Sequence, residues 1–317
     1  MSFRIRIALV GIAALATCAL ASAQQARMKI LLDTDIGTDI DDAWALGYAL
    51  KSPSFDLLGV TVSDADTPKR ARLACKMLQR LGRTNVPVAV GRQTPAVPPA
   101  RIDYQFTWAE DFEAYRPIAI PAADFLADTI RRNPHAVTLI AIGPLQNVGD
   151  LVRLHPDVVH LVKRVVLMSG SIGPNAWSSM AVPEWNVKLA IPEAQAVYAA
   201  DWPLTVVPLD STSYLQLQDS ERETLRKTGT PLVMALEALL RLWSDRPDRR
   251  MTLHDQAALA EAQHPGRFFN RCESMPLRVD DEGYTRVDRT NGRAVVVCLE
   301  PKRNEFMAHY LAQLASK

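Results

Sequence analysis

The chain has 317 residues, enough for one large α/β domain or two small ones. Hydrophobic residues make up 48% of it and charged residues 22%, which is ordinary for a globular protein and argues against disorder. The formal net charge is +1 and no basic stripe is interleaved with aromatic residues, so nothing indicates a nucleic-acid-binding protein.

The first 23 residues have the pattern of a secretory signal peptide. A basic start precedes a short apolar run over residues 7–20, which ends at an A-x-A cleavage site at residues 21–23. A lipoprotein box ending at Cys18 is a poorer fit, because a threonine precedes the cysteine. We therefore expect a periplasmic or secreted protein, with one mature domain over residues 24–317 and no membrane attachment after cleavage.

Beyond this leader, apolar runs of strand length alternate with helical patterns. Strands are predicted at residues 28–32, 55–62, 86–90, 136–142, 162–168 and 204–208. Helices are predicted at residues 42–50, 67–81, 121–132, 145–154, 192–200, 231–243 and 254–263, and from about residue 303. The helix at 67–81 is expected to have a basic outer face. Short β segments are expected at residues 276–280, 284–288 and 294–299.

The alternation of strands and helices predicts an α/β fold. Because the strands are continuously apolar, we expect a mostly parallel central sheet with helices on both faces, a Rossmann-like open sheet. Residues 92–120 are rich in proline and aromatic residues without a clear period, which is typical of a long functional loop or lid. Ligands of such sheets bind beyond the carboxyl ends of the strands, so the active site is expected there.

Five carboxylates follow the first strand within ten residues, at Asp33, Asp35, Asp39, Asp41 and Asp42. Like charges at this spacing repel one another unless a cation lies among them. Capping of the next helix would explain Asp41 or Asp42. It does not explain Asp33 and Asp35, which leave the strand itself. The run therefore indicates a cation site.

Two other interpretations of this acidic run do not match the residues at the positions that they require. An EF-hand loop starting at Asp33 requires glycine and glutamate where Thr38 and Trp44 stand. A phosphatase of the aspartyl-phosphate type requires Gly-Thr directly after its DxD motif, where Ile36 intervenes. A site for a hard cation remains, built by the loop together with distant ligands, and Ca²⁺ is expected in preference to Mg²⁺.

The acidic run also resembles a known signature. Residues 33–37 and 41–43 are similar to the DxDPGxDDA motif of the inosine–uridine-preferring nucleoside hydrolases, with Ile36 for proline and the two-residue insertion Thr38-Asp39. Later motifs of the family follow in order over roughly residues 28–316. They are Leu58-Gly59-Val60-Thr61-Val62, Gly143-Pro144-Leu145-Gln146-Asn147, Met168-Ser169-Gly170, Pro183-Glu184-Trp185-Asn186 and Leu253-His254-Asp255.

This resemblance implies a Ca²⁺-dependent nucleoside hydrolase that splits the N-glycosidic bond of ribonucleosides into base and ribose, for nucleoside salvage. The implied metal ligands are Asp35, Asp42, Asp255 and the backbone carbonyl of Ile142, where the family usually has threonine. Asp35 would also be the general base for the attacking water. A homo-oligomer, dimer or tetramer, is expected on the same grounds.

The resemblance also implies roles in substrate binding. His254 would lie near the leaving base and donate a proton or a hydrogen bond; the alternative is a structural histidine at a helix start. The implied contacts of the ribose are Asp33, Asp41, Glu184, Trp185, Asn186 and Asn175, together with Asp66, or else Asp64, in place of an asparagine that the family has after the second strand.

Three questions stay open at this point. Phe106, Trp108 and Trp177 could stack on a base or anchor a loop, so base preference is not predicted. Cys272 and Cys298 could pair in an oxidising compartment, or lie buried as thiols with Cys75. A non-catalytic nucleoside- or sugar-binding protein on the same scaffold, and a hydrolase of another N-riboside, are the alternatives in function.

Overall fold

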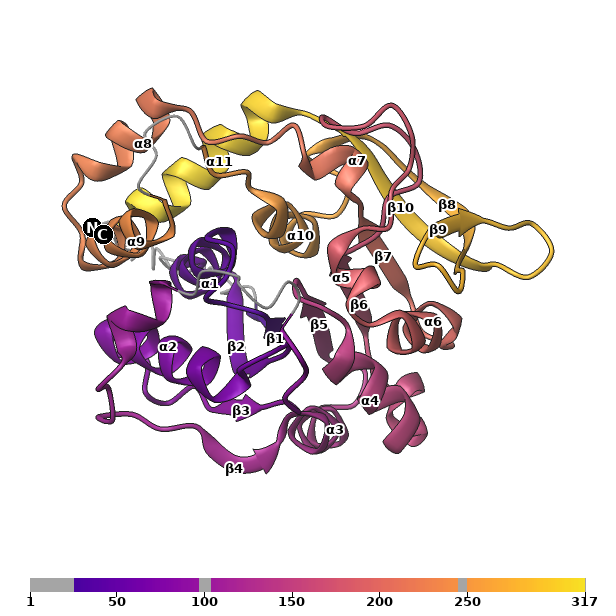
Figure 1. The fold of residues 1–317 in the computed structure, drawn as a ribbon, viewed down its shortest axis with the longest axis horizontal. Helices are drawn as coiled ribbons and strands as arrows, with labels where there is room; N and C mark the ends of the chain where they lie inside the picture. Colours follow the sequence, from indigo (N-terminus) through magenta and orange to yellow (C-terminus); the bar gives the residue numbers. More distant parts are fainter. Residues whose placement is uncertain (1–25, 97–103, 245–249, 317) are drawn as a thin grey trace, which may run out of the picture.

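The first strand, β1 (Met28–Thr34), lies inside a ten-stranded sheet in the computed structural model, which describes residues 26–96, 104–244 and 250–316. The strand order is β4-β3-β2-β1-β5-β6-β7-β10-β8-β9 (Figure 1). The strands from β4 to β10 pair in parallel, and β8 and β9 add antiparallel pairs at one end. The other strands are β2 (Phe55–Val62), β3 (Val88–Val90), β4 (Ile118–Pro121), β5 (Val137–Ala141), β6 (Arg164–Met168), β7 (Leu204–Val207), β8 (Phe269–Val279), β9 (Thr285–Val287) and β10 (Arg293–Pro301).

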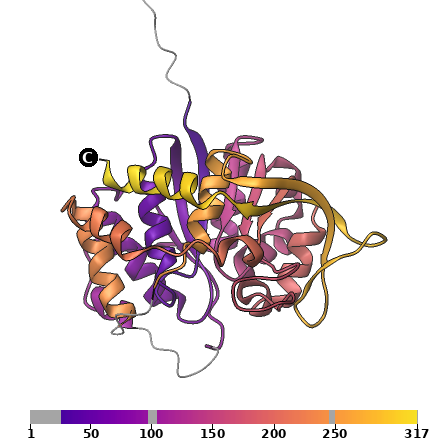
Figure 2. The same cartoon turned by 90° about the horizontal axis from the view of Figure 1, so that it is seen from above.

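Helices cover both faces of this sheet (Figures 1 and 2). One face carries α1 (Asp41–Lys51), α2 (Thr67–Arg80), α9 (Pro231–Trp243), α10 (His254–Gln263) and α11 (Arg303–Ala315). The other face carries α3 (Ala122–Arg132), α4 (Gln146–Leu154) and α6 (Ile191–Ala199). Shorter helices are η1 (Tyr104–Ala109), η2 (Pro156–Leu161), α5 (Trp185–Lys188), α7 (Leu209–Thr212) and α8 (Asp219–Arg226). The predicted α/β class with a mostly parallel sheet is confirmed.

The apolar pattern of β1 follows from its position between two cores. Ile30 and Leu32 pack into the core beneath α1, α2, α9, α10 and α11, and Leu31 packs into the core on the opposite face. Successive side chains of a strand point to opposite faces, so a strand covered on both sides needs an unbroken apolar run. This burial keeps β1 central and brings its carboxyl end between those of β2 and β5.

The structure adds elements that the sequence pattern did not predict. The predicted loop at residues 92–120 contains η1 and the edge strand β4, while its residues 97–103 lie outside the described part of the chain. Strand β8 begins at Phe269, ahead of the predicted residue 276. Polar residues, most of them exposed, predominate in this first part of β8, so its strand character comes from pairing with β10 rather than from an apolar pattern. The predicted signal peptide also lies outside the described residues.

The question about the cysteines has a structural answer. Cys272 of β8 lies directly opposite Cys298 of β10 in the antiparallel ladder, and the two form a disulfide. Cys75 is a buried free thiol on α2, and burial raises its pKa to about 12. Among the residues that the structure describes, no helix is long and apolar enough to cross a membrane.

Candidate active site

A cavity of about 390 Å³ opens at the carboxyl ends of β1, β5 and β6. This volume lies in the range of small-molecule sites, and the position is the one expected for a parallel sheet. Most of the predicted site residues line it. They are Asp35, Asp41, Asp42, Ile142, Glu184, Trp185, Asn186, His254 and Asp255.

The acidic loop, residues 35–40, connects β1 to α1, and hydrogen bonds to Asp42 hold the start of the loop against the helix. Asp42 lies in the first turn of α1, and its Oδ1 accepts hydrogen bonds from Thr34 Oγ1 and from the backbone N–H of Asp35 at 3.1 Å. Gly37 makes the turn with a φ of +119°, where a Cβ would lie 2.1 Å from the ring of Phe106. Asp35 is thereby held at the cavity, directly after the end of the strand.

Three carboxylates form the most compact group in the cavity. One oxygen each of Asp41, Asp42 and Asp255 lies within 4.8 Å of the others, and all three residues are buried. Burial, followed by repulsion from neighbouring carboxylates, raises the pKa of each well above its usual value. Within the described part of the chain, no lysine or arginine forms an ion pair with any of them. Clustered oxygen donors that form no ion pair with a basic side chain fit a hard divalent cation.

The compact group differs from the ligand set expected from the resemblance. Asp41, expected to bind ribose, belongs to the group, while Asp35 lines the same cavity outside it. Asp35 lies next to the β5 end, because Gly143 has no side chain there: a Cβ would meet the Asp35 backbone nitrogen at 2.7 Å. The cavity therefore offers Asp35, the three carboxylates of the compact group and the end of β5 to a cation.

The Ile142 carbonyl is held by a neighbouring amide. Asn186 Nδ2 donates to the Ile142 oxygen at 2.9 Å and to the Met168 oxygen at 3.0 Å, so one side chain joins the ends of β5 and β6. A carbonyl has two lone pairs, and the second remains for another partner. The Ile142 side chain itself packs in the core.

Glu184 precedes α5 and organises it. Its Oε1 accepts the Asn186 N–H at 2.9 Å, and its Oε2 accepts the Gly170 N–H at 2.9 Å. Burial raises the pKa of this carboxyl to about 7, against the lowering effect of these hydrogen bonds. Glu184, Trp185 and Asn186 together form a polar and aromatic wall of the cavity.

His254 begins α10 beside Asp255. Its Nδ1 lies 2.8 Å from Thr212 Oγ1, and its ring centroid lies 5.7 Å from that of Trp177. Burial lowers the pKa of His254 to about 4, although the carboxylate of Asp39 acts in the opposite direction. The ring is therefore neutral near pH 7, and when the Thr212 hydroxyl donates to Nδ1 the ring proton is on Nε2, as a hydrogen-bond donor.

Three predicted sugar contacts are not among the residues that line the cavity. Asp33 Oδ1 accepts Thr61 Oγ1 at 2.5 Å and Asn147 Nδ2 at 2.7 Å, so this buried carboxyl joins β1 to β2 and α4. Burial raises its pKa to about 7. Asp66 is the N-cap of α2, and its side chain accepts the Lys69 N–H at 3.2 Å.

Asn175, the third of these residues, shapes a turn. Its Oδ1 accepts the Trp177 N–H at 3.0 Å, and its backbone forms a bridge with Ser178. This turn presents Trp177 at the cavity, where its side chain is 59% exposed. Asn175 therefore acts in this arrangement through Trp177 rather than as a lining residue.

The aromatic residues left open by the sequence separate into two groups. Phe106 is buried against Gly37, and Trp108 packs with Lys76, whose Nζ lies 4.6 Å from the ring centroid. Both anchor η1, and of the three candidates only Trp177 lines the cavity. The lining residues not predicted are Asp39, Met168, Val182, Pro183 and Leu209. Asp39 was visible in the acidic run, whereas the apolar ones carry no chemical signal in the sequence.

Comparisons with known proteins agree with this geometry. The family model described as inosine-uridine preferring nucleoside hydrolase matches residues 30–309. The pyrimidine-specific ribonucleoside hydrolase RihA of Citrobacter koseri is 30% identical over 256 residues, which cover 76% of this chain and 81% of the relative. RihA of Enterobacter is 32% identical over 222 residues, covering 67% and 70% of the two chains.

Solved structures show the same fold. A purine-preferring ribonucleoside hydrolase from Gardnerella vaginalis has a TM-score of 0.79 at 22% identity, covering 90% of this chain and 98% of the other. The inosine-uridine preferring nucleoside hydrolase from Bacillus anthracis has a TM-score of 0.74 at 20% identity, with the same coverage. The match over most of the chain, with the acidic cavity at the strand ends, places this protein in the inosine-uridine preferring nucleoside hydrolase family.

Proposed function

We propose that this protein hydrolyses the N-glycosidic bond of ribonucleosides and releases the base and ribose. The observation that carries the proposal is one cavity that combines an oxygen-only acidic group with a neutral histidine beside an exposed tryptophan. The first can hold a cation and a polar sugar, and the second suits a flat heterocycle. The relatives described above are all named as nucleoside or ribonucleoside hydrolases.

The reaction makes specific demands on the residues of the cavity. Cleavage of an N-glycosidic bond passes through a sugar with oxocarbenium character, whose positive charge is stabilised by nearby carboxylates. Asp35 accepts the proton of the attacking water, because it is the aspartate that directly follows β1 and lines the cavity. Glu184 and Asn186 bind the sugar hydroxyls and position the sugar ring next to Asp35, the general base.

Ca²⁺ is the cation we propose for the site. The supporting donors are the carboxylates of Asp35, Asp41, Asp42 and Asp255 and the carbonyl of Ile142, all hard oxygens. Ca²⁺ accepts six to eight such oxygens in flexible geometry, which suits a set drawn from a loop, a strand end and a helix start. When bound, the ion supplies positive charge that lowers the pKa of the attacking water and orients the sugar hydroxyls.

A panel of nucleosides, assayed for released ribose with and without chelator, tests the proposed function. We expect ribose release from at least one purine or pyrimidine ribonucleoside, and none from the chelated protein. The competing binding protein would bind a nucleoside in calorimetry without releasing ribose. A protein that neither binds nor cleaves any nucleoside in the presence of Ca²⁺ would contradict both.

His254→Ala is expected to affect substrates according to their leaving groups. Nε2 of the neutral ring can donate to a departing base, so kcat/KM for a nucleoside should fall by about 10²–10³-fold. The effect on p-nitrophenyl riboside should be small, since its leaving group needs no proton. Glu184→Ala, by contrast, should weaken the binding of both substrates. An equal loss with both substrates in His254→Ala would show that the histidine is structural.

We further propose that the protein is exported and loses its leader. The support is the signal-peptide pattern of residues 1–23 together with the Cys272–Cys298 disulfide, since such bonds persist in oxidising compartments. N-terminal sequencing of the exported protein should find Gln24 at or near the start. A retained Met1 or a lipidated Cys18 would contradict this.

A further inference from the structure

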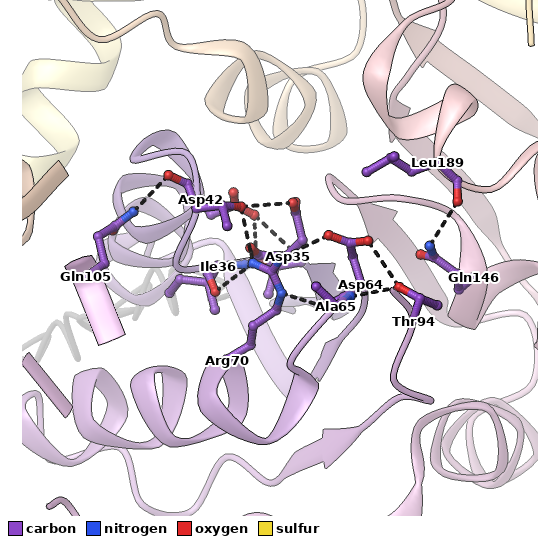
Figure 3. A network of polar contacts seen from close by, with 12 residues as sticks. Asp35, Ile36, Asp42, Asp64, Ala65, Arg70, Thr94, Gln105, Gln146 and Leu189 are labelled. Atoms are coloured by element: carbon purple, nitrogen blue, oxygen red, sulfur yellow. Dashed lines mark hydrogen bonds and ion pairs between the residues drawn. The ribbon is translucent and has the colours of Figure 1, made fainter. Parts of the chain in front are cut away.

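A fully buried arginine lies behind the acidic loop. Arg70 of α2 is 1% exposed, and a buried cation is costly unless its donors are satisfied. Its Nη2 pairs with Asp64 Oδ2 at 2.9 Å, and its Nε donates to the Asp64 carbonyl at 2.7 Å (Figure 3). One edge of the guanidinium is thus fully occupied by a single residue.

The other edge of Arg70 holds the acidic loop. Nη1 donates to the backbone oxygens of Asp35 and of Ile36, the latter at 3.2 Å, and to Thr38 Oγ1 at 3.3 Å. Thr38 Oγ1 in turn lies 3.5 Å from Asp35 Oδ2. Because the guanidinium is planar and its donors have fixed directions, the position of Asp64 determines where Arg70 can hold the loop. Figure 3 shows Arg70 between the Asp64 turn and the loop.

Asp64 is itself held in an uncommon conformation. Asp64 and Ala65 have φ angles of +69° and +51°, in the left-handed region that residues other than glycine rarely adopt. Thr94 supports this turn: its Oγ1 accepts the Ala65 N–H at 2.8 Å and donates to Asp64 Oδ1 at 3.3 Å. Strained residues persist only where their surroundings determine them, which shows how firmly the Asp64 carboxylate is placed against Arg70.

A second support reaches the loop from η1. Gln105 Nε2 donates to the Asp39 carbonyl at 2.8 Å and to the Thr38 carbonyl at 3.3 Å, and Phe106 packs against Gly37. Thr38 and Asp39 are the two residues by which this loop exceeds the common family signature. Both supports thus act on the insertion.

The loop needs such support on physical grounds. Two extra residues increase the number of conformations it can adopt, and the repulsion among Asp35, Asp41 and Asp42 favours the open ones. We propose that Arg70, fixed by Asp64, and Gln105 are positioning residues that hold the lengthened loop so that its aspartates face a single cation. This inference rests on the proposed cation site and adds residues that do not touch the cation.

Three substitutions on the full mature chain test the inference, with Ca²⁺ binding measured by isothermal titration calorimetry. Asp64→Asn and Arg70→Lys should each raise the dissociation constant for Ca²⁺ by about 10–100-fold, the usual cost of losing a residue that orients metal ligands. The lysine keeps the charge but lacks the planar fork. Gln105→Leu should raise the constant in the same direction and is the mildest change to the fold.

Glu237→Gln provides the matched control. Glu237 is a buried carboxylate that pairs with Arg222 at 2.7 Å, and the pair joins α8 to α9 outside the cavity. This variant should lose thermal stability and keep the wild-type affinity for Ca²⁺. Comparing affinity with melting temperature then separates positioning from general destabilisation.

The outcomes are distinguishable. The positioning role would be overturned if folded Gln105→Leu bound Ca²⁺ with wild-type affinity and if Arg70→Lys or Asp64→Asn did so as well. A loss of affinity in Glu237→Gln equal to that in Gln105→Leu would overturn it as well, since stability alone would then explain the effect. A wild-type protein that binds no Ca²⁺ in the titration would refute the proposed cation, and the inference with it.

Discussion

Asp35→Asn should lower kcat by about 10²–10⁴-fold with every nucleoside that the protein cleaves, and by a similar factor with p-nitrophenyl riboside. The reason is that the substitution removes the acceptor of the water proton, a role that does not depend on which leaving group departs. This separates Asp35 from His254, whose loss should depend on the leaving group. The measurement is kcat for both substrates, with circular dichroism to confirm that the variant is folded.

Asp66→Asn is the informative comparison for Asp35→Asn. It makes the same chemical change at a residue that the resemblance places at the sugar and the structure places at the N-cap of α2. Asparagine caps a helix as well as aspartate does, so activity and stability should both be retained. Wild-type kcat in Asp35→Asn would refute the general base, and a large loss in Asp66→Asn would refute the structural assignment.

Removal of the cation is the second change with a large expected effect. Chelation should abolish activity and lower the melting temperature, and the loss of stability should be greater at about pH 8 than at about pH 5. Without a cation, the raised pKa values of Asp41, Asp42 and Asp255 mean that the folded state binds protons more tightly than the unfolded state. The metal-free protein is therefore stabilised as the pH falls through these values and destabilised as it rises.

The stabilisation that the bound cation gives to the folded protein has the opposite dependence on pH. The ligands of the cation must be deprotonated, so its contribution to the free energy of unfolding grows as the pH rises. Binding at 100 times the dissociation constant adds about 2.7 kcal/mol to the free energy of unfolding. Thermal unfolding with EDTA and with excess Ca²⁺, at both pH values, measures the difference. Identical melting temperatures, with full activity after exhaustive chelation, would contradict the metal site.

Much of the fold was predictable from local patterns. The predicted bounds of β2, α9 and α10 agree with the structure, because each has a continuous apolar run or a helical apolar period that burial requires. The four-residue helices α5 and α7 were not predicted, since a single turn shows no period. They exist because their end residues find partners in other segments, such as Glu184 with the Gly170 N–H.

The site was predictable where its residues are close in sequence. Asp35, Asp41 and Asp42 follow one strand, so their clustering was visible without a structure. Asp255 could be assigned only through the resemblance, because the fold brings α10 to α1 from more than 200 positions away.

Arg70 shows the limit of local reasoning. In the sequence it belongs to the basic outer face predicted for the helix at residues 67–81, whereas the structure buries it. Lys69 and Arg72 next to it remain partly exposed, so periodicity alone could not separate them. Burial of Arg70 is tolerable because its donors are bound by Asp64 and by the acidic loop. These two partners follow the ends of β2 and β1, and they become neighbours only when the sheet has formed.

The amide of Asn186 has a consequence for how position 142 can vary. Asn186 donates a hydrogen bond to the main-chain oxygen of Ile142, an atom that every amino acid possesses, while the Ile142 side chain packs in the apolar core. The main-chain oxygen and the side chain of Ile142 therefore have separate roles, one at the cavity and one in the core. A hydrophobic side chain at this position can be chosen for how well it fills the core, without altering the atom offered to the ligand.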